Sequence, residues 1–470
     1  MGNLYSIEDL EAWDERIQER AREFGLDCYP QQFEICDHNQ MLSSMAYSGV
    51  PSHYPHWSYG KAYEKQKTLY DYGVSGLPYE MVINSNPALA YLMRDNTLLL
   101  QILTIAHVYG HNDFFKNNFT FKTTRAEYTI DTFKAHGDRV RLYMEDPSIG
   151  LENVEKLLDA AHAVSLQCRR NLAIRKRTYE EERGVLLEST LPPADPFRSI
   201  HRKKTSPPPN LNKVPPAPDE DLLLFIRDHN PNLARWEKDI LTIVHEEAQY
   251  FIPQIETKIM NEGWATYWHK KILDSLDLPQ DLQLEFIVRH NQVVRPFENG
   301  LNPYHLGLAV WADIYRRNNQ SANPAENTGE DKLFEVREAD RDTSFLRRHL
   351  TEDLIRELNL FEYETKGDQK VVRNVADRNG WTQVKEALLK NVGMKTVPVI
   401  KVEDADFGHS HTLYLVHHHD GRDLQLEYAE KTLAYLSQLW HGEVVLETAL
   451  DNKRYMLVYN DGGFSTKALR

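Results

Sequence analysis

The sequence predicts a mainly α-helical (α+β) protein, with a large helical body over residues 1–390 and a small α+β domain over 391–470. Two stretches of the body, 5–24 and 151–185, place apolar residues three and four positions apart among Glu, Arg and Lys, which is typical of amphipathic surface helices. The stretch 97–115 is apolar on nearly every side, so it predicts a helix through the interior. After Thr396, β-branched and aromatic residues alternate or cluster, which favours strands.

The composition predicts a folded, acidic chain. With 470 residues, of which 41% are hydrophobic and 27% charged, the chain is long enough for two or three domains. The net charge of -15 argues against a general binder of nucleic acid or anionic membranes, because both need a concentrated basic face. The sequence contains no signal-peptide pattern and no window of about eighteen uncharged apolar residues. We therefore expect a cytoplasmic protein without membrane insertion.

A proline-rich stretch interrupts the helical body at residues 203–221. Its six prolines remove hydrogen-bond donors and favour extended backbone. It is either a linker between domains or an arm that lies over the surface, and we favour the arm because both flanking segments read as parts of one helical body. A second polar stretch, 318–332, predicts an exposed loop.

The C-terminal domain is predicted to have the order β-β-α-β-β. The strand patterns and the single helical pattern occupy, in chain order, residues 397–405, 411–419, 426–440, 443–450 and 454–461. The sequence DNKR turns the last hairpin, because Asp and Asn adopt tight backbone conformations readily.

The predicted interior helix contains two histidines four residues apart, His107 and His111. Residues at this spacing lie on one helix face, so both imidazoles can reach one point, as paired metal ligands do. The H-V-Y-G-H spacing is that of a zincin helix, but Val108 stands where the general-base glutamate belongs. Taken alone, such a buried pair is more often structural, with each ring bonded to a carbonyl or carboxylate group. Both interpretations remain open on this pair.

A second cluster strengthens the metal interpretation. In residues 245–269, Pro253 is predicted to separate two helices, and Glu262 and His269 lie seven positions apart on one side of the later helix. A carboxylate among Met and Trp side chains is costly to bury unless it is paired or ligates a cation. The alternative is that Glu262 caps a helix or forms a salt bridge and that His269 simply ends its helix.

These residues predict a metal centre within the helical body. The candidate ligands are His107, His111 and Glu262, with His269 as a fourth ligand or a supporting contact. A His-His-Glu set leaves one coordination position open, and zinc or another divalent ion bound there makes a bound water acidic.

Further side chains are candidates for catalysis and binding. Glu262 is the first candidate for catalysis, and Glu246 or Glu34 can replace the missing base only if the fold brings one of them near. The stretch 51–65 combines aromatic residues, histidines, a glycine and a lysine, which is typical of a pocket wall or lid; aromatic packing around a glycine turn is the alternative. The candidate binding residues are His56, Trp57 and Lys61 in this stretch, and Asn112 and Trp264 beside the candidate ligands.

Several long strings resemble the stage V sporulation protein R (SpoVR) family of bacteria. They are YPHWSYGK, YEMVINSNP, AHVYGHNDFFKNN, TKIMNEGWATYWH and NPYHLG, and the resemblance covers most of residues 10–450. It implies a cytoplasmic protein linked to the spore cortex, the cell envelope or stress physiology, present also in bacteria that do not sporulate, and often encoded beside a serine protein kinase. The form YGHNDFFKNN is most similar to members from non-sporulating bacteria. The resemblance does not imply a biochemical activity.

The NEGWATYW string is also similar to the EGWA segment of some zinc peptidases, where the glutamate is the third ligand after an H-E-x-x-H helix. Carried over residue by residue, this similarity implies His107, His111 and Glu262 as ligands and leaves Val108 in the place of the base. The phosphate-binding loop, the dinucleotide fingerprint and the G-x-S-x-G motif are absent from the sequence, which argues against nucleotide-driven and triad chemistry.

Two function classes remain open, so the sequence does not decide whether the protein is an enzyme. The first is a non-catalytic regulator that binds a protein partner such as the serine protein kinase. The second is a metal-dependent hydrolase, zincin-like or degenerate. An open cleft that reaches His107 favours the hydrolase, and a sealed, dry polar cluster favours the regulator.

Overall fold

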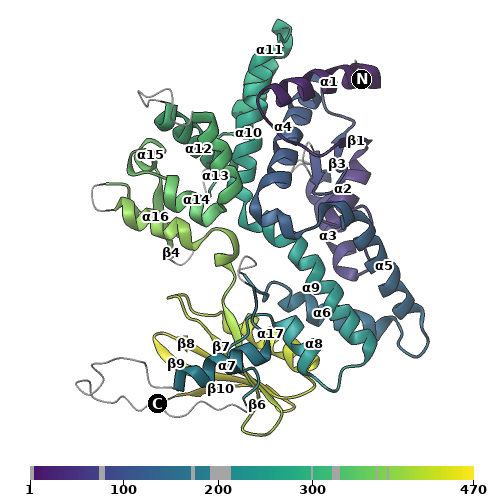
Figure 1. The fold of residues 1–470 in the computed structure, drawn as a ribbon, viewed down its shortest axis with the longest axis vertical. Helices are drawn as coiled ribbons and strands as arrows, with labels where there is room; N and C mark the ends of the chain where they lie inside the picture. The colour runs from purple at the N-terminus through teal and green to yellow at the C-terminus, as the bar shows by residue number, and fades with distance from the viewer. Residues whose placement is uncertain are drawn as a thin grey trace. The chain divides into compact units, whose positions relative to one another are not determined.

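The computed structural model describes residues 5–72, 80–170, 175–190, 213–297, 300–319, 329–366, 369–377 and 380–469. The chain divides into two units (Figure 1), one of Met1–Arg141 with Gln249–Thr396 and the other of Leu142–Ala248 with Val397–Arg470. Helices dominate the described residues, and the strands form small sheets, the largest near the C-terminus. The predicted mainly helical α+β class is therefore confirmed. The predicted domain boundary near residue 390 stays a prediction.

The first unit consists mainly of helices. They are α1 (Ile7–Glu23), α2 (His38–Ala46), α3 (Trp57–Asp71), α4 (Leu98–Asn117), most of α5 (Thr129–Glu145), the end of α9 (Arg235–Glu256), α10 (Lys258–Ser275), α11 (Gln280–Val293), α12 (Pro303–Asn319), α13 (Gly329–Ala339), α14 (Asp342–His349), α15 (Glu352–Glu357) and α16 (Trp381–Lys390). Short 3-10 turns lie at Phe119–Thr123, Ala126–Tyr128 and Gly393–Thr396. The predicted polar loop falls between α12 and α13, where residues 320–328 lie outside the described residues.

Two small sheets belong to this unit. In the first, β3 (Ala88–Met93) is the central strand; it pairs in parallel with β1 (Gln31–Cys36) and antiparallel with β2 (Glu80–Ile83). The second is the hairpin of β4 (Phe361–Lys366) and β5 (Gln369–Val375). The first sheet contributes to the site described below, because β2 contacts α4.

Helix α4 runs through the interior of the first unit, as the sequence predicts. Thr97 begins the helix by accepting a hydrogen bond from the amide of Leu100, and every residue from Leu99 to Phe115 is buried. A helix with apolar residues on all sides has no solvent-facing side, so it must be surrounded by other elements. Helix α10 packs directly on it (Figure 1).

Small residues allow α10 to cross α4 and α12 at very short range. A Cβ atom on Gly110 would lie 2.6 Å from the Cα atom of Ala265. A Cβ atom on Gly263 would lie 2.4 Å from the backbone of Gly307, and one on Gly307 would lie 2.2 Å from the carbonyl oxygen of Ile259. Only residues with little or no side chain fit at these crossings. These close crossings bring together the face of α4 that contains the two histidines, the face of α10 that contains Glu262, and the start of α12.

A buried ion pair and an indole ring lock α4 to its neighbours. Arg337 Nη1 donates to Asp113 Oδ1 at 2.6 Å, and Trp264 Nε1 donates to Asp113 Oδ2 at 2.8 Å. Burial raises the pKa of Asp113, whereas the charge of Arg337 opposes that shift. The Trp264 ring packs against Trp311, with ring centroids 4.9 Å apart, in the core of the unit.

The break between α9 and α10 lies at Thr257, so the prediction that Pro253 separates the two helices is wrong. Pro253 lies inside α9, one turn before its end. The Thr257 hydroxyl donates to the Pro253 carbonyl at 2.7 Å. In the first turn of α10, the backbone N–H groups of Ile259 and Met260 have no acceptor within the helix. Both donate to the buried carboxylate of Asp342 at 2.9 Å. The new helix therefore begins where a carboxylate can accept its free N–H groups.

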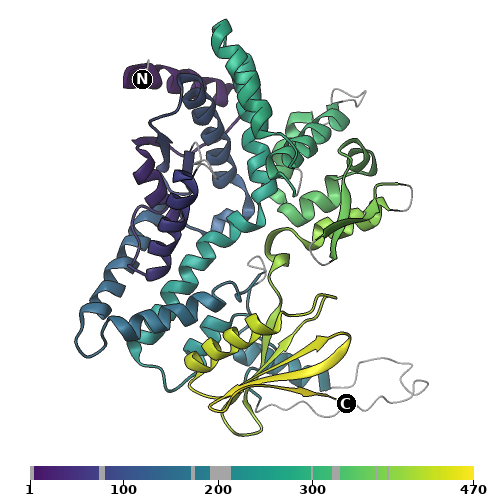
Figure 2. The same ribbon diagram turned by 180° about the vertical axis from the view of Figure 1, so that it is seen from behind.

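The second unit combines helices with a five-stranded sheet. Its helices are α6 (Leu151–Val164), α7 (Tyr179–Thr190), α8 (Leu222–His229), α17 (Leu426–Trp440) and the remaining parts of α5 and α9. The strands, in spatial order, are β10 (Gly463–Ala468), β9 (Lys453–Asn460), β8 (Val444–Leu450), β7 (Thr412–His417) and β6 (Ile400–Phe407). Figure 2 shows α17 across one face of this sheet, where it contacts β8 and β9. The predicted order β-β-α-β-β is present, and β10 is an additional strand.

The described part of the proline-rich stretch lies along the outer edge of β6. Val402 and Asp219 exchange two backbone hydrogen bonds of 2.7 and 3.0 Å, and the amide of Ala405 donates to the carbonyl of Val214 at 2.7 Å. These bonds cover an edge that would otherwise expose unpaired N–H and C=O groups. The preceding residues, 203–212, lie outside the described residues. None of the described helices is long and apolar enough to cross a membrane.

Candidate functional site

Three of the residues predicted as metal ligands meet inside the first unit. His107 Nε2 lies 3.7 Å from Glu262 Oε2, and His111 Nε2 lies 3.5 Å from the same oxygen. The two imidazole rings are nearly perpendicular, with centroids 4.6 Å apart. Helix α4 supplies both rings from one face, and its close crossing with α10 places the carboxylate of Glu262 beside them.

A further acid, Glu80 of β2, belongs to the same group. Its Oε1 atom lies 3.9 Å from His107 Nε2. One ligand atom from each of Glu80, His107 and His111 lies within 4.8 Å of the others, the one group of this kind found among the described residues. The sequence analysis did not identify Glu80. Its only local signal is an acid at the start of the short strand pattern in YEMVINSNP.

The separations within this group suit ligands of one ion better than hydrogen-bond partners. Hydrogen bonds between nitrogen and oxygen are about 2.7–3.2 Å long, whereas the distances here are 3.5, 3.7 and 3.9 Å. Atoms bound tetrahedrally to zinc at roughly 2.1 Å lie about 3.4 Å from one another. His107 Nε2 and Glu262 Oε2 are buried without a hydrogen-bond partner, which is costly unless another group satisfies them. The residues present therefore fit a divalent metal ion.

Asn261 fixes the ring of His111. The Asn261 Oδ1 atom lies 2.8 Å from His111 Nδ1. An amide oxygen only accepts, so Nδ1 donates and Nε2 keeps its lone pair on the side of Glu262. Histidines that bind metals almost always donate their second N–H group in this way.

His269 holds His107 from the opposite side. His107 Nδ1 lies 2.9 Å from His269 Nδ1, and His269 Nε2 lies 2.9 Å from His290 Nδ1 on α11. When His107 Nε2 carries the lone pair, Nδ1 donates to His269, which in turn donates to His290. The structure thus places His269 in contact with His107, in the position of a supporting residue. His290, also buried, extends the chain of imidazoles.

Burial favours the neutral form of His111, His269 and His290. It lowers the pKa of His111 and of His290 to about 4 and lowers the pKa of His269 well below the usual value. Neighbouring imidazoles and Lys270 act in the same direction. A neutral imidazole is the form that can bind a cation through its lone pair.

The two acids of the group are shifted in opposite directions. Burial raises the pKa of Glu80, and the charge of Glu262 adds to that shift, although His107 opposes it. Burial acts to raise the pKa of Glu262 too, but its interactions with His107 and His111 outweigh burial and lower it. The charge of Glu262 raises the pKa of the Tyr304 hydroxyl on α12, and burial adds to that shift, so this hydroxyl keeps its proton.

The group borders a cavity of about 500 Å³, whose described lining includes Glu80, His111 and Glu262 but not His107. Asn261 and Tyr304 are further polar residues of the lining. Its apolar residues are Val82, Phe115, Phe251 and Ile255, and the lining is completed by Ser48, Gln254 and Lys258. A molecule that enters this cavity therefore meets both an apolar surface and the carboxylate–histidine group.

Asn112 and Trp264, two of the predicted binding residues, make structural contacts. Asn112 is fully buried, and its side chain binds the backbone amide of Tyr29 at 2.7 Å and the backbone carbonyl of Tyr29 at 3.0 Å. Trp264 is fully buried and donates to Asp113. Neither side chain lines the cavity among its described residues, and a binding role for either stays a prediction.

The other predicted binding residues lie at the start of α3. His56 Nδ1 accepts from the amide of Ser58 and begins the helix. Lys61 lies over the ring of Trp57, 5.6 Å from its centroid, and Trp57 is half exposed. None of these predicted residues is in the described lining of the cavity.

The two alternative acids lie on exposed positions. Glu34 is exposed on β1, and Glu246 is exposed on α9 in the part that belongs to the second unit. Neither is in the described lining of the cavity. Their predicted catalytic roles remain predictions.

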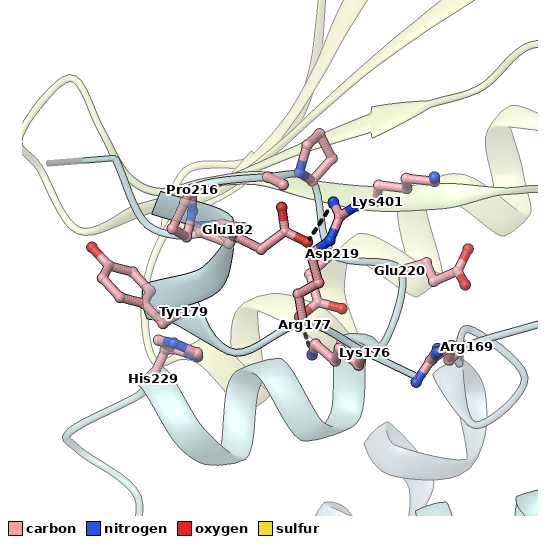
Figure 3. A pocket seen from close by; sticks show the side chains of 13 residues that line it. Arg169, Lys176, Arg177, Tyr179, Glu182, Pro216, Asp219, Glu220, His229 and Lys401 are labelled. Carbon is pink, nitrogen blue, oxygen red and sulfur yellow. Dashed lines mark hydrogen bonds and ion pairs between the residues drawn. The ribbon is translucent and has the colours of Figure 1, made fainter. Parts of the chain in front are cut away.

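A second pocket, of about 330 Å³, lies in the second unit beside the proline-rich arm (Figure 3). Charged residues of both signs line it, and two ion pairs form among them: Lys176 contacts Asp219 at 2.5 Å, and Arg177 contacts Glu182 at 3.6 Å (Figure 3). No metal-ligating group was found there among the described residues. The pair of Lys176 with Asp219 contributes to the packing of the arm.

Comparison with known proteins identifies the family. A family model described as SpoVR like protein matches residues 5–397, and one described as SpoVR-like C-terminal domain matches residues 398–451. The chain belongs to the SpoVR family. It is 30% identical over 484 aligned residues to the Uncharacterized protein YcgB of Escherichia coli (strain K12), an alignment that covers 95% of this chain and 93% of that protein. No solved structure matches the chain.

The strings that resemble the SpoVR family supply the site. YEMVINSNP contains Glu80, AHVYGHNDFFKNN contains both histidines of α4, TKIMNEGWATYWH contains Glu262, and NPYHLG contains Tyr304. The same strings contain the glycines at the helix crossings, Gly110, Gly263 and Gly307. In this SpoVR chain, segments that are far apart in the sequence thus form both the close helix crossings and the carboxylate–histidine group beside them.

Proposed function

We propose that this SpoVR-family protein is a metal-dependent hydrolase, with His107, His111 and Glu262 as ligands and Glu80 as general base. The observation that carries the proposal is a buried group of imidazole nitrogens and carboxylate oxygens 3.5–3.9 Å apart that borders a cavity. A purely structural polar cluster would satisfy its atoms through hydrogen bonds, whereas His107 Nε2 and Glu262 Oε2 have no such partner.

Each residue of the group has a defined task. The Nε2 atoms of His107 and His111 and the carboxylate of Glu262 would hold zinc or another divalent ion, which would supply a Lewis acid and an acidic bound water. Asn261 and His269 keep the two rings in the required orientation through their hydrogen bonds. The apolar residues of the lining, Val82, Phe115, Phe251 and Ile255, would lower the local polarity and so strengthen electrostatic interactions inside the cavity.

Glu80 provides the carboxylate that the histidine helix lacks. Val108, at the usual position of the base, is fully buried in the core. Glu80 comes from β2, lines the cavity and lies farther from His107 Nε2 than Glu262 does. A carboxylate in this position can take a proton from water and pass it to the leaving group. The protonated hydroxyl of Tyr304 is placed to donate to a carbonyl oxygen as negative charge develops there.

Replacement of Glu80 by glutamine tests whether this residue acts as a general base or as a metal ligand. We expect the Glu80→Gln variant to keep its metal but to hydrolyse a peptide library roughly 100- to 10,000-fold more slowly, the usual contribution of a general base. Metal content is measured by mass spectrometry and product release by liquid chromatography. Glu11→Gln, a change on an exposed position of α1, is the matched control and should behave like the parent. Loss of metal in Glu80→Gln would make Glu80 a ligand, and absence of any product from the metal-loaded parent would reject peptide hydrolysis.

The alternative function, a non-catalytic regulator, is not favoured by any specific contact among the described residues. Binding of a serine protein kinase or another protein partner stays a prediction, as do a cytoplasmic location and a link to the spore cortex or stress physiology.

A further inference from the structure

We propose that the cavity accepts a short peptide or acyl-amino acid that ends in a free carboxylate, and that Lys258 recognises this carboxylate. The inference rests on the proposed hydrolase and adds the class of its substrate. It predicts that the enzyme cleaves close to the C-terminal end of a chain.

Lys258 supplies the positive charge in the described lining of the cavity. It is the first residue of α10 and precedes Glu262 by four positions, so the two side chains lie on one face of the helix. Its side chain is exposed, and it forms no ion pair among the described residues. The other charged residues of the lining are the two acids of the proposed centre, Glu80 and Glu262. An anionic group that enters the cavity is therefore drawn to Lys258 and repelled from the acids.

The spacing along α10 matches one or two residues of a peptide. Side chains four apart on a helix have Cβ atoms about 5–6 Å apart, and one residue of an extended chain spans roughly 3.3–3.6 Å. A carboxylate held by Lys258 would thus leave the carbonyl of a peptide bond near the C-terminal end within reach of Glu262. Phe115, Phe251 and Ile255 line the same cavity and suit an apolar side chain of the bound molecule.

A single ammonium group suits a carboxylate better than a phosphate. Phosphate sites in proteins combine several donors, such as helix N–H groups and arginine forks. The described lining contains no arginine, and Ser48 and Gln254 are the neutral polar residues outside the proposed centre. These two side chains can instead hydrogen-bond to the amide groups of a peptide.

The reaction is ordinary hydrolysis of an amide. The oxygen of water bonds to the carbonyl carbon, the carbon–nitrogen bond breaks, and the proton that leaves water is passed by Glu80 to the departing nitrogen. The products are an acid and a free amino acid or short peptide, and no further reactant is required.

Binding of N-acetyl-L-phenylalanine and of its neutral primary amide to the full, zinc-loaded chain tests the inference. In isothermal titration we expect the acid to bind about 10-fold more tightly than the amide, because one charge-assisted contact is lost in the amide. Lys258→Gln should abolish this preference, and Lys258→Arg should retain it. Lys65→Gln removes another exposed lysine, on α3 and outside the described lining, and should leave the preference unchanged.

Each other outcome overturns a different statement. Equal binding of acid and amide to the parent would reject carboxylate recognition. A preference that survives in Lys258→Gln and disappears on removal of zinc would assign the carboxylate to the metal instead of Lys258. Tighter binding of phenyl phosphate than of the acid would indicate a phosphate-containing substrate instead of one with a free carboxylate. Failure of the parent to bind zinc would reject the proposed hydrolase. The comparison of acid and amide binding, repeated on the zinc-free chain, would still test whether Lys258 recognises the carboxylate.

Discussion

Replacement of Glu262 by glutamine is expected to remove the bound metal while leaving the fold intact. The amide has almost the same shape as the carboxylate, and Glu262 Oε2 has no hydrogen bond to lose. The oxygen nevertheless lies 3.5 Å from His111 Nε2 and 3.7 Å from His107 Nε2, where its charge would face the ion. We expect metal affinity to fall by more than about 100-fold, because even residues that only support a ligand contribute about 10- to 100-fold.

Metal titration and thermal melting together distinguish the roles of Glu262. Glu11→Gln again serves as the control, because it makes the same chemical change on an exposed position of α1. A purely structural Glu262 predicts the opposite pattern: unchanged metal content, with a loss of stability of about 1–3 kcal/mol if the amide leaves a buried partner unpaired. A Glu262→Gln variant with the metal content of the parent would reject Glu262 as a ligand.

Replacement of Gly263 by alanine is expected to have the largest effect on stability. The new Cβ atom would lie 2.4 Å from backbone atoms of Gly307, and no flexible side chain is present there to move away. Helices α10 and α12 would have to separate, which disturbs the aromatic core around Trp264 and Trp311. Overpacking of a core costs about 1–3 kcal/mol and occasionally more. We expect a loss of at least about 3 kcal/mol, because the clash is with backbone.

Gly60→Ala provides the matched control for this prediction. Gly60 also lies inside a helix of the first unit, but a Cβ atom added there meets nothing within 4 Å. The same substitution should therefore stabilise the protein by about 0.4–1 kcal/mol, because alanine has less freedom in the unfolded chain and a higher helix propensity. Denaturant unfolding of both variants measures the difference. Similar stability of Gly263→Ala and the parent would contradict the close crossing of α10 and α12.

The sequence predicts those features that depend on short-range patterns. The apolar run of α4 identifies an interior helix, and the four-residue spacing of His107 and His111 places both rings on one face of it. The strand order of the C-terminal sheet follows from alternation, except for β10, whose residues are mostly exposed and therefore lack an apolar face to recognise. Pro253 illustrates the limit of a local rule, since the helix end depends on the distant carboxylate of Asp342.

The composition of the site depends on contacts between distant segments, which single-sequence patterns do not encode. Glu80 and Tyr304 come from β2 and α12, and only the crossings of α10 with its neighbours bring them beside the histidines. Asn112 has the polar character of a binding residue in the sequence. Its actual partner, the backbone of Tyr29, is a contact across 83 positions. Residue type alone does not distinguish an asparagine that binds a ligand from one that binds the protein backbone.

Metal analysis of the full chain, purified without a chelator or a histidine tag, tests the proposed centre most directly. The parent is expected to retain about one zinc or other divalent ion per chain, and the His111→Ala variant is expected to retain almost none while melting as a folded protein. Equal and negligible metal in both proteins would contradict the metal centre and leave His107, His111 and Glu262 as a buried polar network.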